Sequence, residues 1–276
     1  MRKSLILCLV FGFIACTRNA NTNQTGKDTS VTETVAIKST TQKELDKAPV
    51  IHDYPADTVY DARIIIPGGV FHEDEVDPKS AEYAWMGLFK NDIGYYLAPT
   101  QVNLARSFDA VLDNEEKKTG WTITPSVKDS AICLISGVKN LQAQPIDSIP
   151  LPKKQLLPGE QIAFRYKSVS YVLSATGHKT LEKPNADSYA VTAYKLTLEA
   201  IINGERVKQK LVSISRFDDT MTNIYFAGDI DGDDIPDFII DTTNHYNVSQ
   251  PTLYLSKPAT KGNLLKVMGM HVSVGC

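Results

Sequence analysis

The sequence has few cysteines and lacks the common catalytic motifs. Cys8 and Cys16 lie near the N-terminus, which leaves Cys133 and Cys276 as the remaining pair. In an oxidising compartment this pair forms a possible disulfide; alternatively, Cys133 is a buried thiol and Cys276 a frayed end, and the sequence leaves both open. The chain has no GxSxG, HExxH or phosphate-loop motif and no Cys/His pair at catalytic spacing. These absences favour a protein that is not an enzyme.

An excess of charge of one sign is missing as well. The 29 basic and 32 acidic residues leave a formal net charge of -3, and no basic patch stands out. Because binding to the phosphate backbone needs such a patch, we expect no nucleic-acid partner. The rest of the composition, 42% hydrophobic and 22% charged, is ordinary for a soluble globular protein, and 276 residues suffice for one large or two small domains.

The N-terminal apolar run is too short to cross a bilayer as a mature helix. It covers residues 5–14 and follows the basic pair Arg2 and Lys3, as in an export signal. The run ends in FIAC at residues 13–16, which resembles the lipobox of bacterial lipoproteins. The resemblance implies a signal peptide at 1–15, a lipidated Cys16 and a membrane anchor formed by several acyl chains. An ordinary cleaved secretory signal is the alternative.

Residues 16–49 contain hardly any bulky apolar side chains. They are rich in Thr, Asn, Ser, Lys and Gln, so they bury too little surface to offset the entropy of ordering. We predict a flexible tether. For a lipoprotein of this type, Thr17 after the lipidated cysteine implies a place in the cell envelope, at the outer membrane and facing the periplasm.

The remaining chain predicts a mainly β fold, with antiparallel sheets in two lobes and little helix. Residues 50–144 form a β-rich lobe, with strands expected at 58–66, 94–110, 120–124 and 130–138, while 81–90 fits a short helix or a strand. His72 and the acidic residues that follow it at 73–77 are a possible metal site, but a solvated loop is favoured. Four prolines in 144–159 predict an extended connection between the lobes.

Residues 160–276 form the second lobe, an antiparallel β lobe with a strand at 161–174 and a polar loop at 176–187. Asn203-Gly204 is a strong hairpin signal, because a type I′ turn needs positive φ at both central residues. This turn predicts three apolar-face pairs and an attractive Glu199–Lys208 pair on the other face. The three pairs are Ala200 with Val207, Leu198 with Gln209 and Leu196 with Leu211. We expect the hairpin and the C-terminal strands to form one sheet of about five or six strands.

The segment beginning at Asp229 has the spacing of a calcium loop. Its side-chain ligands at positions 1, 3, 5 and 9 are Asp229, Asp231, Asp233 and Asp237. The Ile235 carbonyl is available at position 7, and Gly232 permits the tight turn. Position 12, where the helical calcium loop has Glu, is Ile240, so a strand follows the loop. These carboxylates repel one another unless a cation neutralises them, which favours a Ca²⁺ site over a bare acidic turn.

Residues 226–241, FAGDIDGDDIPDFIID, resemble the calcium loop of FG-GAP and VCBS-type repeats. The resemblance implies these five ligands and a structural Ca²⁺ that holds the turn between two strands. Asp234 occupies a position where the family usually has Gly. If the loop needs the αL conformation there, an aspartate has to adopt it. Because the chain has one such loop, a multi-bladed propeller is not supported.

The polar segment after the loop contains a possible ligand site formed by Asp241, Asn244 and His245. His245 is either a general base or a hydrogen-bonded loop histidine, and the second interpretation is favoured because no nucleophile is paired with it. The sequence thus predicts a membrane-tethered envelope lipoprotein that binds an unknown envelope protein or glycan and carries a structural calcium. The alternative is a periplasmic hydrolase that uses His245 with Asp241 near the metal loop.

Overall fold

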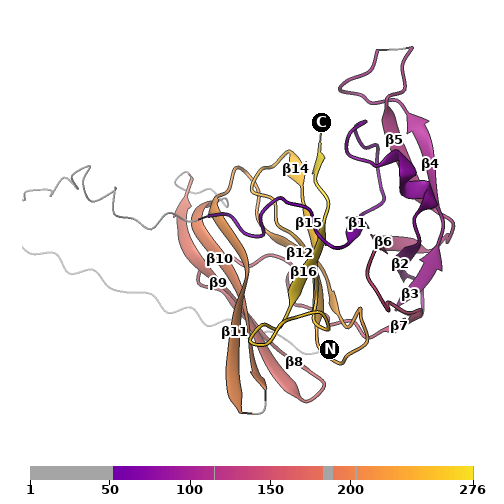
Figure 1. The fold of residues 1–276 in the computed structure, drawn as a ribbon. Coiled ribbons are helices and arrows are strands. Elements are labelled where there is room, and N and C mark those ends of the chain that lie inside the picture. The colour runs from indigo at the N-terminus through magenta and orange to yellow at the C-terminus, as the bar shows by residue number, and fades with distance from the viewer. Residues whose placement is uncertain (1–51, 115, 183–188, 203, 276) are drawn as a thin grey trace, which may run out of the picture. The chain divides into compact units, whose positions relative to one another are not determined.

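Antiparallel strands make up nearly all of the regular secondary structure of the described residues, as the sequence predicts (Figure 1). This computed structural model describes residues 52–114, 116–182, 189–202 and 204–275. The predicted signal peptide and tether, with Cys16, lie outside the described residues, as do Asn203 and Cys276. Residues Pro49–Cys276 form one compact unit. None of the described helices is long and apolar enough to cross a membrane.

A four-stranded sheet near the end of the chain is the centre of the fold. Its order is β12-β13-β15-β16, with strands β12 (Asn223–Gly228), β13 (Asp237–Asp241), β15 (Pro251–Leu255) and β16 (Lys266–Met270). Every residue of β13 and β15 is buried. Since alternate strand residues point to opposite faces, Ile239 enters one core while Phe238 and Ile240 enter another. This sheet is therefore covered on both faces.

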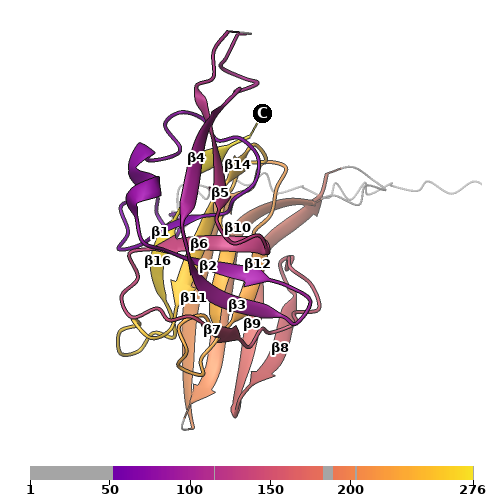
Figure 2. The same cartoon turned by 90° about the vertical axis from the view of Figure 1, so that its right-hand side faces the viewer.

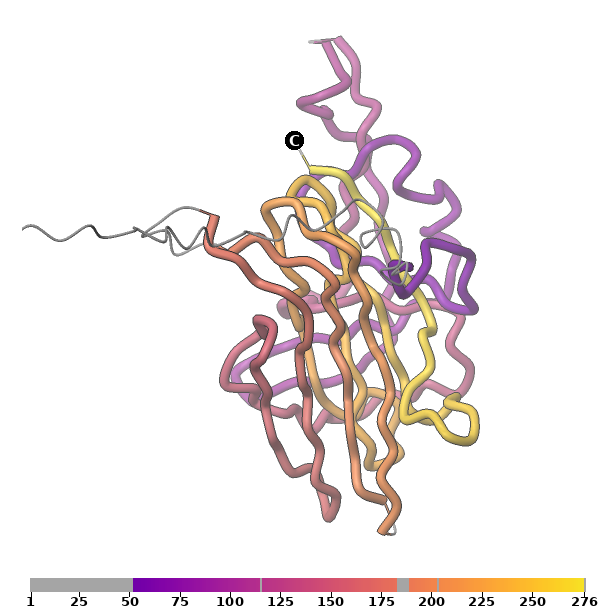
Figure 3. Tube along the Cα trace, turned by 90° about the vertical axis from the view of Figure 1, so that its left-hand side faces the viewer, coloured from indigo at the N-terminus to yellow at the C-terminus, as the bar shows by residue number. Residues whose placement is uncertain are grey.

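One face of the central sheet packs against a sheet of long hairpins. Its order is β11-β10-β9-β8, from β8 (Gln161–Tyr166), β9 (Val169–Leu181), β10 (Tyr189–Ile202) and β11 (Glu205–Arg216). Figure 3 shows these strands running side by side along one side of the unit. Leu173, Leu196 and Leu198 from this sheet share a core with Phe238 and Tyr254 from the central sheet. Apolar area buried at such an interface stabilises the fold by about 25 cal/mol per Å².

The other face packs against a five-stranded sheet from the first half of the chain. Its order is β1-β6-β2-β3-β7, from β1 (Arg63–Ile65), β2 (Trp85–Lys90), β3 (Tyr95–Thr100), β6 (Ser130–Ser136) and β7 (Gln144–Ile146). Leu97 and Ile135 from this sheet meet Ile239 and Leu253 in the second core. The first half thus forms one outer sheet, and the second half forms the central sheet and the other outer sheet.

Smaller elements complete the unit. The hairpin of β4 (Val102–Ser107) and β5 (Gly120–Pro125) extends from the five-stranded sheet (Figure 2) and shares a third core with Trp85 and Leu134. The 3₁₀ helix η1 (Pro78–Glu82) precedes β2, so residues 81–90 end one helical turn and then form a strand. Strand β14 (Val248–Ser249) pairs with β17 (Ser273–Val274).

Several predictions for the second lobe were wrong. The expected strand at 161–174 is two strands with a tight turn at Lys167, whose φ is 50°. The expected loop at 176–187 includes the end of β9, which pairs with β10 up to Leu181. The single sheet of five or six strands is two stacked four-stranded sheets. The reason is that β13 and β15 carry apolar side chains on both faces and need a covering layer on each.

The predicted hairpin register holds near the turn and fails further away. Ala200 pairs with Val207, Leu198 with Gln209 and Glu199 with Lys208, as expected. Leu196, however, pairs with Val212, because a bulge between Leu196 and Thr197 adds one residue to β11. Leu211 nevertheless remains fully buried.

Candidate metal centre

The loop between β12 and β13 turns sharply at two left-handed residues. Gly232 has φ 76°, which fits the predicted role of this glycine in the turn. Asp234 has φ 65°, so the aspartate that replaces the usual glycine does adopt the αL conformation. The exposed Asp234 carboxylate lies 3.4 Å from the Lys167 ammonium.

Three of the predicted ligands converge. Asp229, Asp231 and Asp237 each offer a carboxylate oxygen, and these oxygens lie within 4.8 Å of one another. Oxygens that bind one Ca²⁺ at 2.3–2.6 Å are at most about 4.6–5.2 Å apart. This group could therefore hold a metal ion, and carboxylates are the oxygen ligands that hard cations prefer.

The other two predicted ligands have different surroundings. Asp233 is outside the converging group, and its Oδ1 accepts hydrogen bonds from the Ser256 hydroxyl at 2.8 Å and the Ile235 amide at 3.0 Å. The Asp233 carboxylate is thus turned toward the end of β15. A role of the Ile235 carbonyl as a ligand stays a prediction.

Backbone amides hold the carboxylates in place. Asp229 accepts bonds from the amides of Gly232, Asp233 and Asp234, which fold the loop around its first residue. Asp237 Oδ2 accepts from the Ile230 amide at 2.7 Å and the Asp231 amide at 3.0 Å, and its Oδ1 accepts from the Ser256 amide at 2.7 Å. Asp237 therefore joins the loop to the neighbouring strand β15.

Burial and mutual repulsion disfavour the charged forms of two of these groups. Burial, and then the charges of Asp233 and Asp229, raise the pKa of Asp231 to about 6. Burial and the charge of Asp231 raise the pKa of Asp237 well above its usual value. A bound cation opposes both effects, because it favours the ionised carboxylates.

Residues far away in sequence surround the loop, and the loop motif does not identify them. Gln144 of β7 donates to the Ile230 carbonyl at 3.2 Å, and the Lys257 amide donates to Asp231 Oδ2 at 3.0 Å. The Tyr171 hydroxyl is buried without a hydrogen-bond partner among the described residues. Burial raises the Tyr171 pKa to about 12, and the Asp233 charge adds to this rise.

The possible ligand site beyond the loop is extensively hydrogen-bonded. Buried Asp241 accepts from the Tyr225 hydroxyl at 2.6 Å and the Gln250 amide at 2.9 Å. His245 does not pair with Asp241; its Nε2 lies 3.2 Å from Asp218, and its Nδ1 accepts from the Asn247 amide at 3.1 Å. Both ring nitrogens are therefore engaged in contacts within the fold.

Asn244 connects two distant segments. Its side-chain amide donates to Asp53 at 3.1 Å, and its backbone carbonyl accepts from the Asp218 amide at 2.9 Å. These contacts support the interpretation of residues 241–245 as a hydrogen-bonded loop.

The acidic segment after His72 makes structural contacts. Asp77 caps η1 by accepting from the Lys79 amide at 2.9 Å. His72 Nδ1 lies 2.5 Å from buried Asp109, near the end of β4. Hydrogen bonding to Asp109 raises the His72 pKa, and the same contact contributes most to lowering the Asp109 pKa. These pairings agree with the favoured non-metal interpretation of this segment.

Cys133 is a buried thiol in the second core, and burial raises its pKa to about 12. The described structure shows it unpaired. Because Cys276 lies outside the described residues, the disulfide between these two cysteines stays a prediction.

The chain matches no protein-family model, and no curated protein and no solved structure matches it significantly. The resemblance to FG-GAP and VCBS-type loops therefore rests on residues 226–241 alone. Membership of such a family stays a prediction.

Proposed function

We propose that this protein is a membrane-tethered envelope lipoprotein that acts as a binding module and carries a structural Ca²⁺ in the β12–β13 loop. The observation that carries the proposal is the convergence of Asp229, Asp231 and Asp237 in the loop that joins β12 to β13 of the central sheet. The leader, the lipobox-like FIAC at 13–16 and the polar tether support the envelope location.

The position of the group favours a structural role for the cation. Asp237 begins β13 and is bonded to the Ser256 amide just after β15, so a cation here would act on the junction of two fully buried strands. Those strands supply both large cores. An ion that stabilises the loop would therefore stabilise the whole unit.

A binding role fits the tether and the absence of a catalytic arrangement around His245. We propose an envelope protein or a glycan as partner, presented to a compartment where calcium is available. Extracellular-type calcium sites have dissociation constants of about 10⁻⁴–10⁻³ M. The hydrolase alternative has less support, since His245 contacts Asp218 and Asn247.

Thermal melting of the compact unit Pro49–Cys276 tests the proposal. At a free calcium concentration 100 times the dissociation constant, one site adds about 2.7 kcal/mol of stability. For a domain of this size we expect a rise in melting temperature of about 5–10 °C relative to EDTA.

Magnesium at the same concentration and the exposed-site variant Asp74→Asn serve as controls. Asp74→Asn should respond to calcium like the parent, because its side chain lies outside the converging group. Identical melting in EDTA and at about 10–100 mM calcium, which is 100 times a dissociation constant of about 10⁻⁴–10⁻³ M, would remove the structural calcium from the proposal.

A further inference from the structure

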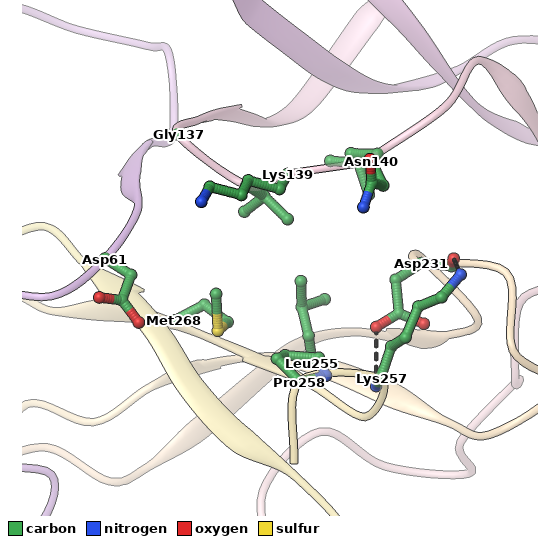
Figure 4. Close-up of a pocket in the computed structure, with 11 residues that line it drawn as sticks. Asp61, Gly137, Lys139, Asn140, Asp231, Leu255, Lys257, Pro258 and Met268 are labelled. Carbon is green, nitrogen blue, oxygen red and sulfur yellow. Dashed lines mark hydrogen bonds between the residues drawn. The ribbon is translucent and has the colours of Figure 1, made fainter.

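A cleft of about 530 Å³ lies beside the metal loop. Residues 137–141, which follow β6, form one wall, and the end of β15 together with β16 forms the other. In Figure 4, Lys139 and Asn140 on the upper wall face Leu255, Lys257 and Met268 on the lower wall. The volume is in the range of small-molecule sites, about 300–1,000 Å³.

The middle of the cleft is apolar. Leu255 and Met268 form its floor, and both are buried members of the second core. Val138 and Leu141 line the opposite wall and pack against the same core. An apolar ligand group placed here would contact side chains already fixed by packing, so little side-chain entropy would be lost on binding.

The charged side chains that line the cleft differ in whether they have a bonding partner. Asp61 is bound by Lys266 at 2.5 Å, and Asp231 accepts from the Lys257 amide at 3.0 Å. Lys139, in contrast, makes no side-chain hydrogen bond or ion pair with any residue that the structure describes. The Lys257 ammonium donates a long hydrogen bond to the Asp231 carbonyl, at 3.5 Å. The Asp61 pKa is lowered mainly by its bond to Lys266 and also by the charge of Lys139, so Lys139 lies near this carboxylate without bonding to it. The Lys139 ammonium therefore keeps its hydrogen-bonding capacity for a ligand.

The backbone places these polar groups on the wall. Gly137 has φ 87° and Asn140 has φ 62°, so two left-handed residues flank Val138 and Lys139. Gly137 is also close to the Asp61 carbonyl, where an added Cβ would lie 3.0 Å away. This tight approach fixes the start of the wall.

We propose that this cleft binds a small organic anion with an apolar body, whose carboxylate or sulfonate pairs with Lys139 and whose body lies on Leu255 and Met268. The inference deepens the proposed binding role and rests on it. It does not need the calcium, because the cation supplied by the chain is Lys139.

Fluorescence titration with anilinonaphthalene sulfonate tests the assignment, since this probe is a monoanion with an aromatic body. We expect saturable binding to the unit Pro49–Cys276 in calcium, and at least about tenfold weaker binding to Lys139→Glu, which places like charges together. The neutral probe phenylnaphthylamine should bind parent and Lys139→Glu equally.

Two variants keep the test specific. Lys118→Glu makes the same charge change on an exposed lysine between β4 and β5, and it should bind the sulfonate probe like the parent. Asn140→Gly removes the side-chain amide at a residue whose φ suits glycine, so it should fold normally and bind about two- to threefold more weakly, as expected for one modest polar contact.

Competition identifies the source of the anion. Displacement of the probe by octanoate assigns a free acid, whereas displacement by a short apolar peptide with a free C-terminus, but not by its amide, assigns a peptide end. Equal probe affinity of parent and Lys139→Glu, or displacement by neither competitor at millimolar concentration, would overturn the cleft assignment. Neither result depends on the calcium-dependent melting that tests the metal loop, so the two failures are distinguishable.

Discussion

Asp109 and Asp237 are both buried, yet their environments have opposite effects on their charge. Asp109 is 1% exposed and lies 2.5 Å from His72, and its pKa is lowered. Asp237 is 0% exposed and lies in the group that includes Asp229 and Asp231, and its pKa is raised. Both accept backbone hydrogen bonds, so such bonds alone do not explain the difference.

The difference is the source of positive charge. At Asp109 the chain supplies its own cation, a histidine from a distant segment. At Asp237 the charge that acts on the carboxylate is that of another carboxylate, Asp231, which either protonation or the cation that we propose would balance. Buried charges are stable only when they are paired. The comparison therefore identifies the group around Asp237 as the one on which the proposed cation would act.

The largest effect is expected for Asp237→Ala. The change leaves three buried amides without their acceptor, those of Ile230, Asp231 and Ser256. Each unsatisfied buried group costs about 1–3 kcal/mol, and we expect a loss of about 3 kcal/mol or more in calcium. Urea unfolding measures the loss. Exposed Asp234→Asn is the control, and a parent-like midpoint for Asp237→Ala would contradict the role given to this carboxylate.

The calcium response should separate the two regions. Asp231→Asn removes one charge from the converging group, so we expect most of the stabilisation of about 2.7 kcal/mol at saturating calcium to be lost. Asp109→Asn should lower the baseline stability but keep the full response. Melting curves of both variants in EDTA and in calcium check this. If Asp109→Asn alone lost the calcium response, the site that responds to calcium would be the one at Asp109 and not the one at Asp237.

The His72–Asp109 pair should give a pH-dependent contribution of defined sign. The folded pKa of His72 is raised above 6.5, so the contribution is full below pH 6.5 and is lost as the pH rises through the raised value. The folded pKa of Asp109 is lowered below 3.8, so its contribution is lost as the pH falls through that lower value. The stability gap between parent and Asp109→Asn should be larger at about pH 5.5 than at about pH 8.5. The midpoints of urea unfolding at both pH values measure this difference in stability. An equal difference at the two pH values would contradict a stabilising His72–Asp109 pair.

A partly exposed pair provides the smallest effect and a baseline. Glu199 faces Lys208 across the hairpin and lies 3.4 Å from Arg206. We expect Glu199→Gln to cost about 0.2–1 kcal/mol and to cost less at high salt. If Glu199→Gln lost as much stability as Asp237→Ala, the burial of a carboxylate would not explain how much its removal costs.

The loop was predictable because its geometry is local. The spacing of the aspartates and Gly232 placed three of four side chains together, since alternate loop residues turn toward one centre. The orientation of the Asp233 carboxylate was not predictable, because it accepts a hydrogen bond from Ser256, which lies 23 residues away. Gln144 reaches the loop through sheet packing, which the motif does not encode.

The class of fold was predictable from strand patterns, but the layering was missed. Strands β13 and β15 carry apolar side chains on both faces, which is the signal of a strand covered on both sides. The end of β9 carries exposed residues throughout and forms a strand only because β10 pairs with it. Pairing of this kind depends on a partner strand and leaves no trace in local hydrophobicity.

The central sheet is made from residues 223–270, close to the end of the chain. Both outer sheets precede it, and each keeps an apolar face uncovered until these residues arrive. During synthesis the two large cores therefore stay incomplete until the strands of the central sheet have left the ribosome. Premature collapse of the earlier hairpins against each other would be the main misfolding hazard, and a chain truncated before β12 should aggregate.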